Sequence, residues 1–305
     1  MGIVTVVGST NVDLVAQVQH LPRPGESVGN AVYKQVMGGK GSNQALAAAR
    51  GGATVNFVTC LGRDAFGQVS LKSLVDQELK HDYISFSDEP TGVALIMVDR
   101  DGENMISVAP GANHDLQPAD IDAAARAIEQ SDLVLIQLEI KMETVRRTME
   151  VCRQYGTKVM LNPAPVPAGG LPEGFLDQVD ILVLNETETE RILGYPVFGG
   201  MELPKIAKEF RAEGVGMVVI TLGRKGCYVS SADFEGFTQS FPVKAVDSTG
   251  AGDVFCGYLA AGLADGRPLS EAVRFATAAG AIAVTRAGAQ PSIPHLQEVI
   301  ELIMQ

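Results

Sequence analysis

Continuous apolar runs of strand length alternate with helix-length segments along most of the chain, and this alternation limits the possible folds more than any other feature. The runs are IVTVVGS, TVNFVTCLG, DLVLIQLE, KVMLNPAP, DILVLNETE and MVVITLG. They are apolar throughout rather than at every second residue, which is typical of strands covered on both faces. Helical patterns such as METVRRTMEVCRQYG and LPKIAKEFRAEG separate them, with a glycine near the end of each. The pattern predicts an α/β fold: a doubly wound, mostly parallel sheet with helices on both faces.

One stretch departs from this alternation. Residues 91–111 hold two strand-like apolar runs around Asp101-Gly102, which is a typical hairpin turn. Both faces of the first run are apolar, and such a hairpin is not stable alone in water. We therefore expect a small β-sheet lid, built from about residues 14–37 and 91–110, with one face over the ligand crevice and the other against a second subunit. A buried antiparallel edge of the main sheet is the alternative.

Composition and charge narrow the class of protein. The chain has 305 residues, 46% of them hydrophobic, with no obvious linker or internal repeat, so we expect a single domain over residues 1–305. A net charge of −12 argues against a nucleic-acid partner, which would require a basic surface. No apolar stretch approaches the roughly 20 residues that cross a bilayer. The opening MGIVTVVGST lacks the basic segment of a leader, and the four separated cysteines favour reduced thiols over a zinc site, so we expect a cytoplasmic protein.

Polar residues or glycines follow several of the predicted strands. Ligands of doubly wound sheets bind beyond the carboxyl ends of the strands, so these residues together predict a polar crevice there. Each of them alone could equally be a cap or a turn residue. They are Asn11, Asp13, Glu139, Asn162, Asn185, Glu188, Thr221 and Gly223.

Two glycine clusters narrow the location of the site. The first, MGGKGSNQALAAAR, places Gly38, Gly39 and Gly41 just before an alanine-rich helix, with Lys40 among them. Glycines allow a ligand to approach the backbone closely, and the free amides at the helix start offer hydrogen bonds. The cluster is not a P-loop, because its last glycine follows the lysine. A flexible turn with a solvated lysine is the alternative.

The second cluster, VDSTGAGDVFCGYLAAGLAD, places Gly250, Ala251 and Gly252 at the start of a helix and Asp253 in its first turn. Backbone amides at such a helix start form an anion hole, aided by the helix macrodipole. A dinucleotide fingerprint fails, because the third glycine position of GxGxxG holds Phe255. An anion hole and a carboxylate together suit phosphoryl transfer to an alcohol, with Asp253 accepting the hydroxyl proton. An aspartate that only compensates the helix dipole is the alternative.

The motifs GGKGSNQA and VDSTGAGDVFCG resemble the two signature regions of the ribokinase-like (PfkB) carbohydrate kinases. The likeness extends along the whole chain, in order, through GSTNVD, PGAN, LIQLE, NPAP, NETE, TLG and GAQPSIP. It departs at Ser42 and Ser248, where alanine and threonine are commoner, and both changes are mild. The resemblance implies an ATP-dependent kinase that phosphorylates D-ribose at O5, with Asp253 as the base.

The resemblance also implies roles for individual residues. The sugar hydroxyls would be held by Asn11, Asp13, Gly39, Lys40, Asn43, Glu139 and Asp253. The nucleotide would be bound by Asn185, Thr221, Leu222, Gly223 and Gly252, with Thr277 near the adenine, while Gly250, Ala251 and Gly252 form the anion hole. Mg²⁺ would be held through water by Glu188. A monovalent cation, usually K⁺, would lie behind the anion hole at Asp247, Thr249, Ala283, Arg286, Gly288 and Ser292, and the lids of two subunits would pair in a homodimer.

Related activities remain open. A sister kinase could act on 2-deoxyribose, on another sugar such as fructose, or on a nucleoside. Specificity among them depends on which sugar hydroxyl meets which buried polar group. Asp13 and Glu139 favour a small polyhydroxylated sugar over a nucleoside, because a nucleoside base would require an apolar or aromatic wall. A non-catalytic sugar-binding regulator is disfavoured by the intact Asp253, and a nicotinamide-dependent dehydrogenase by the missing glycine fingerprint.

Overall fold

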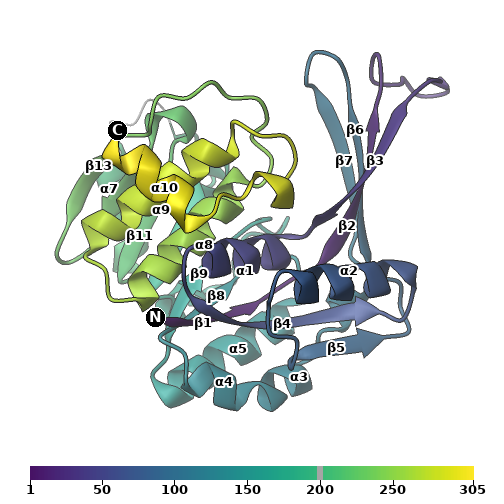
Figure 1. Ribbon diagram of the computed structural model, residues 1–305. Coiled ribbons are helices and arrows are strands. Elements are labelled where there is room, and N and C mark those ends of the chain that lie inside the picture. The colour runs from purple at the N-terminus through teal and green to yellow at the C-terminus, as the bar shows by residue number, and fades with distance from the viewer. Residues whose placement is uncertain (198–201) are drawn as a thin grey trace.

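A nine-stranded sheet forms the centre of the computed structural model, which describes residues 1–197 and 202–305 (Figure 1). In spatial order its strands are β13 (Glu235–Thr238), β12 (Cys227–Ser230), β11 (Met217–Thr221), β10 (Ile181–Asn185), β9 (Lys158–Leu161), β8 (Leu133–Ile136), β1 (Ile3–Val7), β4 (Thr54–Gly62) and β5 (Ile84–Ser87). The strands from β11 to β5 run parallel, and β12 and β13 add antiparallel to the β11 edge. The predicted mostly parallel sheet is confirmed.

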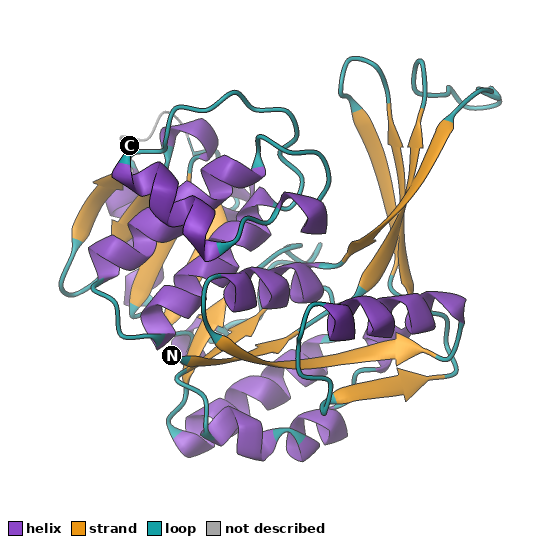
Figure 2. Ribbon diagram, in the orientation of Figure 1, coloured by secondary structure: helices purple, strands orange, loops and turns teal. Residues whose placement is uncertain are grey.

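Helices cover both faces of this sheet (Figure 2). In chain order they are α1 (Lys40–Arg50), α2 (Ala65–Asp76), α3 (Pro118–Ala123), α4 (Ala125–Glu129), α5 (Met142–Tyr155), α6 (Glu186–Leu193), α7 (Leu203–Ala212), α8 (Ala251–Ala264), α9 (Leu269–Ala283) and α10 (Leu296–Met304). Short 3₁₀ turns are η1 (Gly111–Asp115), η2 (Leu176–Gln178), η3 (Gly223–Lys225) and η4 (Gln290–Ser292). Leu133 and Leu135 of β8 share a core with α1, α8 and α9, whereas Val134 and Ile136 share a core with α3, α5 and α7. Two covered faces explain why the strands are apolar at consecutive residues.

The second sheet has four strands and stands away from the helices (Figure 1). Its order is β3 (Val32–Gly38), β2 (Asn11–Gln17), β6 (Gly92–Val98) and β7 (Asn104–Ala109). The predicted small lid sheet is therefore present, and the alternative of an antiparallel edge of the main sheet is wrong. Strand register pairs Asp13 with Ala94 and Leu14 with Leu95, which places these two pairs on opposite faces of the lid.

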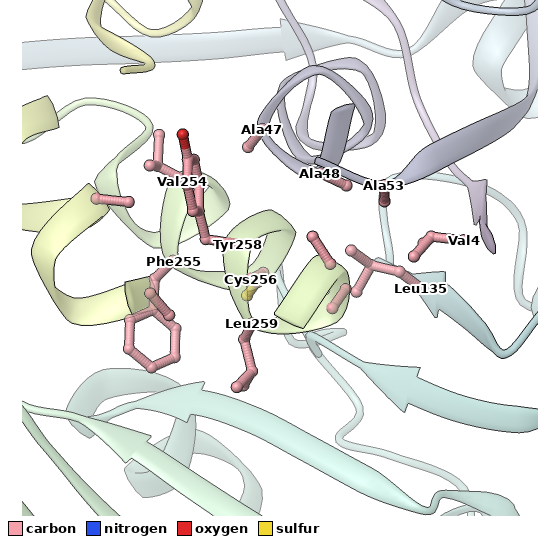
Figure 3. Packing of buried hydrophobic residues seen from close by; sticks show 14 of the residues in the cluster. Val4, Ala47, Ala48, Ala53, Leu135, Val254, Phe255, Cys256, Tyr258 and Leu259 are labelled. Carbon is pink, nitrogen blue, oxygen red and sulfur yellow. The ribbon is translucent and has the colours of Figure 1, made fainter. Parts of the chain in front are cut away.

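Helices α1 and α8 lie against each other over one face of the large sheet. Figure 3 shows Ala47 and Ala48 of α1 close to α8. Gly257 permits this close approach, because a Cβ on residue 257 would lie only 2.5 Å from the Cβ of Ala47. This packing also brings together the first turns of the two helices, which carry the two glycine clusters.

The cysteines are reduced, and the described residues contain neither a cluster of metal ligands nor a helix long and apolar enough to cross a membrane. All four cysteines are buried free thiols, and burial raises the pKa of Cys152 to about 12 and that of Cys227 to about 11. In residues 1–197 and 202–305, no group of three His, Cys, Asp or Glu side chains is placed to hold a metal ion. None of the helices described there combines the length and the apolar character that a bilayer crossing requires.

Candidate active site

The predicted base, Asp253, lies in the first turn of α8 and is 6% exposed. Both of its carboxylate oxygens accept hydrogen bonds from α1: Asn43 Nδ2 donates to Oδ2 at 3.0 Å and Gln44 Nε2 donates to Oδ1 at 2.9 Å. Gly250 precedes the helix with a left-handed φ of 75°, a conformation that glycine adopts without strain. A Cβ at Gly252 would meet no atom within 4 Å, so a ligand can approach the backbone at this helix start, while the Ala251 amide donates to the Ser248 carbonyl at 3.2 Å.

A cluster of charged side chains surrounds Asp253. Asp13 of β2 is 8% exposed, and burial, together with the negative charges of Glu139 and Asp253, raises its pKa to about 7. The negative charge of Asp253 raises the pKa of Lys40, against the opposing effect of burial. Glu139 Oε2 accepts hydrogen bonds from Ser9 Oγ at 2.5 Å and from the Lys40 amide at 3.0 Å. The structure therefore brings these four predicted residues of the sugar site together, although they come from β2, the segment after β8, α1 and α8.

Asn11 of β2 and Gly39 of the first glycine cluster lie on the side of the site nearest the lid. Asn11 is 3% exposed, and its Oδ1 accepts a hydrogen bond from Asn113 Nδ2 at 2.7 Å. A Cβ at Gly39, where φ is 90°, would lie 2.7 Å from the Asn11 amide nitrogen, so only glycine fits. Asn43 Oδ1 is buried without a hydrogen-bond partner in the described chain, so it is an unsatisfied acceptor beside Asp253.

Four of the predicted nucleotide-binding residues lie at the neighbouring strand ends, whereas Gly252 lies in α8 and Thr277 in α9. Asn185 and Thr221 are register partners at the carboxyl ends of β10 and β11. Gly223 has a left-handed φ of 55° with open space around it, and it follows the buried Leu222. Thr277 is also buried, and its Oγ1 donates to the Val273 carbonyl within α9 at 2.8 Å.

The NETE motif forms the start of α6. Asn185 Oδ1 accepts from the Glu188 amide at 2.8 Å, and Glu188 Oε2 accepts from the Asn185 amide at 2.9 Å, which is a reciprocal capping box. Burial raises the pKa of Glu188, while the positive charge of Lys40 opposes that shift. The motif thus has a clear structural role, and the second oxygen of Glu188 is not used in it.

Asp247 holds together the loop that precedes α8 and the loop that follows α9. Its Oδ1 accepts from the amide and the hydroxyl of Thr249, at 2.9 and 2.7 Å, and its Oδ2 accepts from the Gly288 amide at 2.8 Å. Partial burial acts in the opposite direction, but these hydrogen bonds lower the pKa of Asp247. Ala283 ends α9 nearby, with its carbonyl accepting from the Arg286 amide at 3.1 Å.

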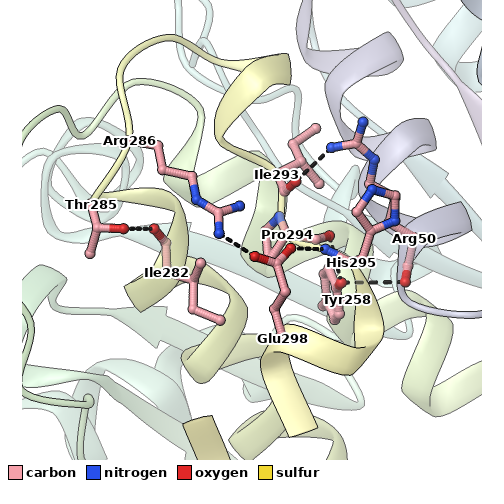
Figure 4. Close-up of polar contacts among 9 residues, drawn as sticks. All are labelled: Arg50, Tyr258, Ile282, Thr285, Arg286, Ile293, Pro294, His295 and Glu298. Carbon is pink, nitrogen blue, oxygen red and sulfur yellow. Dashed lines mark hydrogen bonds and ion pairs between the residues drawn. The ribbon is translucent and has the colours of Figure 1, made fainter. Parts of the chain in front are cut away.

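Side chains of α10 and α1 fix the second of these loops (Figure 4). Arg286 forms an ion pair with Glu298 of α10, and Arg50 of α1 donates to the Ile293 carbonyl at 2.5 Å. Ser292 is buried in η4, and its hydroxyl donates to the carbonyl of residue 289 at 2.7 Å. The predicted cation ligands therefore lie on two adjoining loops that are held by other side chains.

Several polar residues of the site were not among the predicted ligands, namely Ser9, Gln44, Asn113 and Gln137. For Gln44 a signal was available in SNQALAAAR, because three polar residues in a row begin a helix that is otherwise alanine and leucine. For Asn113 it was the polar residue of the PGAN motif. Neither the polar run nor the PGAN motif indicates which residues Gln44 and Asn113 bond to.

Comparisons with known proteins agree along the whole chain. A family model described as pfkB family carbohydrate kinase matches residues 1–296. A ribokinase of Haemophilus influenzae is 39% identical over 98% of this chain and 97% of its own length. A deoxyribokinase of Salmonella typhi is 33% identical over 98% of each chain. A solved structure of Arabidopsis thaliana ribokinase complexed with ribose and ATP aligns with a TM-score of 0.91, at 32% identity, over 99% of this chain and 98% of that one.

The extent of these matches decides the class of protein. The family model and the relatives each cover nearly the whole chain, and the architecture of a large mostly parallel sheet with a separate lid sheet is shared with the solved structure. Kinases of this family use ATP as the phosphoryl donor. The chain is a carbohydrate kinase that belongs to the pfkB family.

Proposed function

We propose that this kinase transfers the γ-phosphoryl group of ATP to the O5 hydroxyl of D-ribose, giving ribose 5-phosphate. The observation that carries the proposal is the buried carboxylate of Asp253 in the first turn of α8, next to the amides from Gly250 to Gly252. In this position Asp253 accepts the proton of the attacking hydroxyl group, and the amides stabilise the negative charge on the phosphoryl oxygens.

The sugar is held by the buried polar groups between the lid and α1. They are Asn11, Asp13, Gly39, Lys40, Asn43 and Glu139, and Asp13 accepts hydrogen bonds from two hydroxyl groups when it is ionised. A buried acceptor that loses its donor is costly, so such a site discriminates strongly against a sugar with one hydroxyl fewer. The similarity to a deoxyribokinase makes 2-deoxyribose the second candidate.

The nucleotide lies across the ends of β10 and β11, against Asn185, Thr221, Leu222 and Gly223, with Thr277 near the adenine. Glu188 fits a magnesium ion held through water, because the capping box uses only one oxygen of its carboxylate. When bound, Mg²⁺ supplies neutralisation of the phosphate charges.

A monovalent cation fits the two loops behind the anion hole. The donor set consists of the Asp247 carboxylate and oxygens of Thr249, Ala283, Arg286, Gly288 and Ser292, several of them backbone carbonyls, which are hard ligands suited to K⁺. When bound, the ion adds positive charge behind the turn that carries the anion hole. Asp247 already positions this turn through Thr249 and Gly288.

A homodimer is formed through the lid. On the face of the lid opposite Asp13, strand register groups Leu14, Leu95, Met97, Met105 and Tyr33. Four of these are more than a third exposed, with Leu95 at 53% and Met105 at 55%. An apolar face of this kind is typical of a subunit interface, and a second copy of this chain offers a matching surface.

The test is ADP formation from ATP and Mg²⁺ with ribose, 2-deoxyribose, fructose, adenosine and pseudouridine as acceptors. Each acceptor is measured with and without K⁺, for the natural chain and for Asp253→Asn. We expect turnover with ribose to exceed turnover with the other acceptors, to rise with K⁺, and to fall by at least about 10²-fold in the variant. Preferred turnover of 2-deoxyribose would replace ribose as the substrate, and an active Asp253→Asn variant would exclude Asp253 as the base.

A further inference from the structure

Gln44 makes contacts that no ligand-binding role requires. It is fully buried in α1, and both hydrogens of its side-chain amide are used within the protein. One is donated to Asp253 Oδ1 at 2.9 Å and the other to Asn162 Oδ1 at 3.1 Å. Asn43, the next residue in the chain, keeps its Oδ1 without a partner in the described residues. Asn43 thus donates to the same carboxylate and has an acceptor left over, whereas every polar atom of the Gln44 side chain is used within the protein.

The supports of Gln44 lie at the ends of two neighbouring strands, and one of them is held in turn by β10. Gln137, after β8, donates from Nε2 to Gln44 Oε1 at 2.6 Å. Asn162, after β9, donates from Nδ2 to the Val183 carbonyl of β10 at 3.0 Å. Gln137 is fully buried, and Gly8 makes room for it, because a Cβ at residue 8 would lie 2.0 Å from Gln137 Oε1.

The direction of every amide in this chain of contacts is fixed. An ionised carboxylate only accepts hydrogen bonds, and a backbone carbonyl only accepts them as well. With Asp253 at one end and Val183 at the other, Gln44 must donate to both Asp253 and Asn162, and its oxygen must face Gln137. A flipped Gln44 would place its oxygen against two acceptors.

We propose that Gln44 is a positioning residue for the carboxylate of Asp253, and that Gln137 and Asn162 hold Gln44 in the donating orientation. The proposal rests on the role of Asp253 as the base. Gln44 fixes the rotamer of Asp253, so that the carboxylate points at the attacking hydroxyl group.

Other groups also act on the charge of Asp253. Lys40 faces it from α1, Asp13 from β2 and Glu188 from α6, and Cys256 lies one turn along α8. All of them are unchanged by a substitution at Gln44. A change in the titration of Asp253 in the uncharged Gln44→Met variant therefore reports the lost hydrogen bond, whereas Gln44→Glu also adds a negative charge beside the carboxylate.

The first measurement is the titration of Asp253 without substrate, by NMR of protein labelled with ¹³C at the aspartate carboxyl carbons. The Asp253 resonance is assigned with Asp253→Asn. In Gln44→Glu a carboxylate replaces the donor, and in Gln44→Met the donor is removed at similar volume. We expect the midpoint of the Asp253 titration to rise in Gln44→Glu, and to rise by less in Gln44→Met. An unchanged midpoint in both variants would overturn the proposal whether or not the chain phosphorylates ribose.

The second measurement is the pH profile of turnover with ribose for the same variants and for Gln137→Met. We expect kcat of Gln44→Glu to fall about 10²-fold, with KM for ribose changed less than about threefold and the acid limb of kcat moved to higher pH. Gln137→Met should change kcat in the same direction by less. The control is Gln130→Glu, an exposed residue after α4, which should leave kcat and its pH profile unchanged.

These two measurements distinguish a failure of the positioning role of Gln44 from a failure of the proposed function. Normal kcat and an unmoved acid limb in Gln44→Glu, when Asp253→Asn is inactive, would exclude the positioning role and leave the proposed function intact. A natural chain that turns over no sugar would count against the proposed function, while the NMR titration would still decide whether Gln44 controls the charge of Asp253.

Discussion

Asp13 lies where negative charges crowd a buried site, and its pKa of about 7 is the consequence. Burial is the main cause, and the charges of Glu139 and Asp253 add to it, while Lys40 is the nearby positive group. In the proposed function, the sugar hydroxyl groups that donate to Asp13 need an ionised acceptor. That function therefore links proton release from Asp13 to sugar binding.

We predict that the affinity for ribose increases with pH around neutrality. With a pKa of about 7, Asp13 is about one-tenth ionised at pH 6 and about nine-tenths ionised at pH 8. The dissociation constant for ribose should therefore fall by up to about tenfold between these pH values, as measured by calorimetry. A constant that stays within about twofold from pH 6 to pH 8 would exclude an acceptor role for Asp13 with this pKa.

The control variant for this prediction is Asp13→Asn, which should bind ribose weakly at every pH. It should also change stability in a pH-dependent way. The folded pKa lies above the ordinary value of 3.8, so the stability of the natural protein falls as pH rises from about 4 to about 7. Urea unfolding at pH 8 should show a more stable variant, with about 4 kcal/mol as the upper bound at roughly 1.4 kcal/mol per pKa unit. At pH 4 the difference should vanish.

At the scale of helices, the contact between α1 and α8 sets the distance between Asp253 and the two amides that hold it. Gly257 permits this contact, and a methyl group there would meet the Cβ of Ala47 at 2.5 Å and the Gln44 carbonyl at 2.6 Å. The backbone that would have to move carries Gln44 itself. A substitution one turn inside α8 thus acts directly on the site.

We predict that Gly257→Ala lowers kcat by at least about tenfold, because a displacement of about 1 Å in a catalytic group is strongly felt. Overpacking should also destabilise the protein by about 1–3 kcal/mol in urea unfolding. The matched control is Gly280→Ala in α9, where the nearest atom is 3.6 Å away. That variant should keep kcat and gain about 0.5–1 kcal/mol of stability. Equal kcat in the two variants would contradict the prediction.

The elements and the strand-end residues could be predicted from the sequence, because hydrophobic periodicity and glycine position are local signals. The contacts of the amide side chains could not be predicted from the sequence, because Gln44 and Asp253 lie 209 residues apart and meet only through the packing of α1 on α8.

The contacts of Ser42 could not be predicted from the sequence either. In the sequence, Ser42 is only a mild departure from the alanine that is commoner in the family. In the structure, its hydroxyl donates to the Gly38 carbonyl at 2.5 Å and accepts from Gln290 Nε2 at 3.2 Å. These bonds tie the first glycine cluster to η4.

At the scale of the whole molecule, the lid presents two faces with different surroundings. The face that contains Asp13 begins at the sugar site, where Asp13 and Ala94 are buried. The opposite face carries Leu95, which is 53% exposed, and Met105, which is 55% exposed. The lid projects from the body of the protein, so helices of the same chain do not cover this second face (Figure 1).

We predict that the natural chain is a dimer in solution and that Leu95→Glu makes it a monomer. Leu95 lies in the middle of the outer face, and a carboxylate there would be buried without a partner when two lids meet. Because the side chain is already half exposed in the single chain, the fold of the monomer should persist, with an unchanged circular dichroism spectrum. Light scattering after size exclusion gives the masses of both proteins. The control is Val69→Glu on α2, which is 46% exposed and lies outside the lid, and it should remain dimeric. A monomeric natural chain, or a dimeric Leu95→Glu variant, would place any subunit contact on another surface.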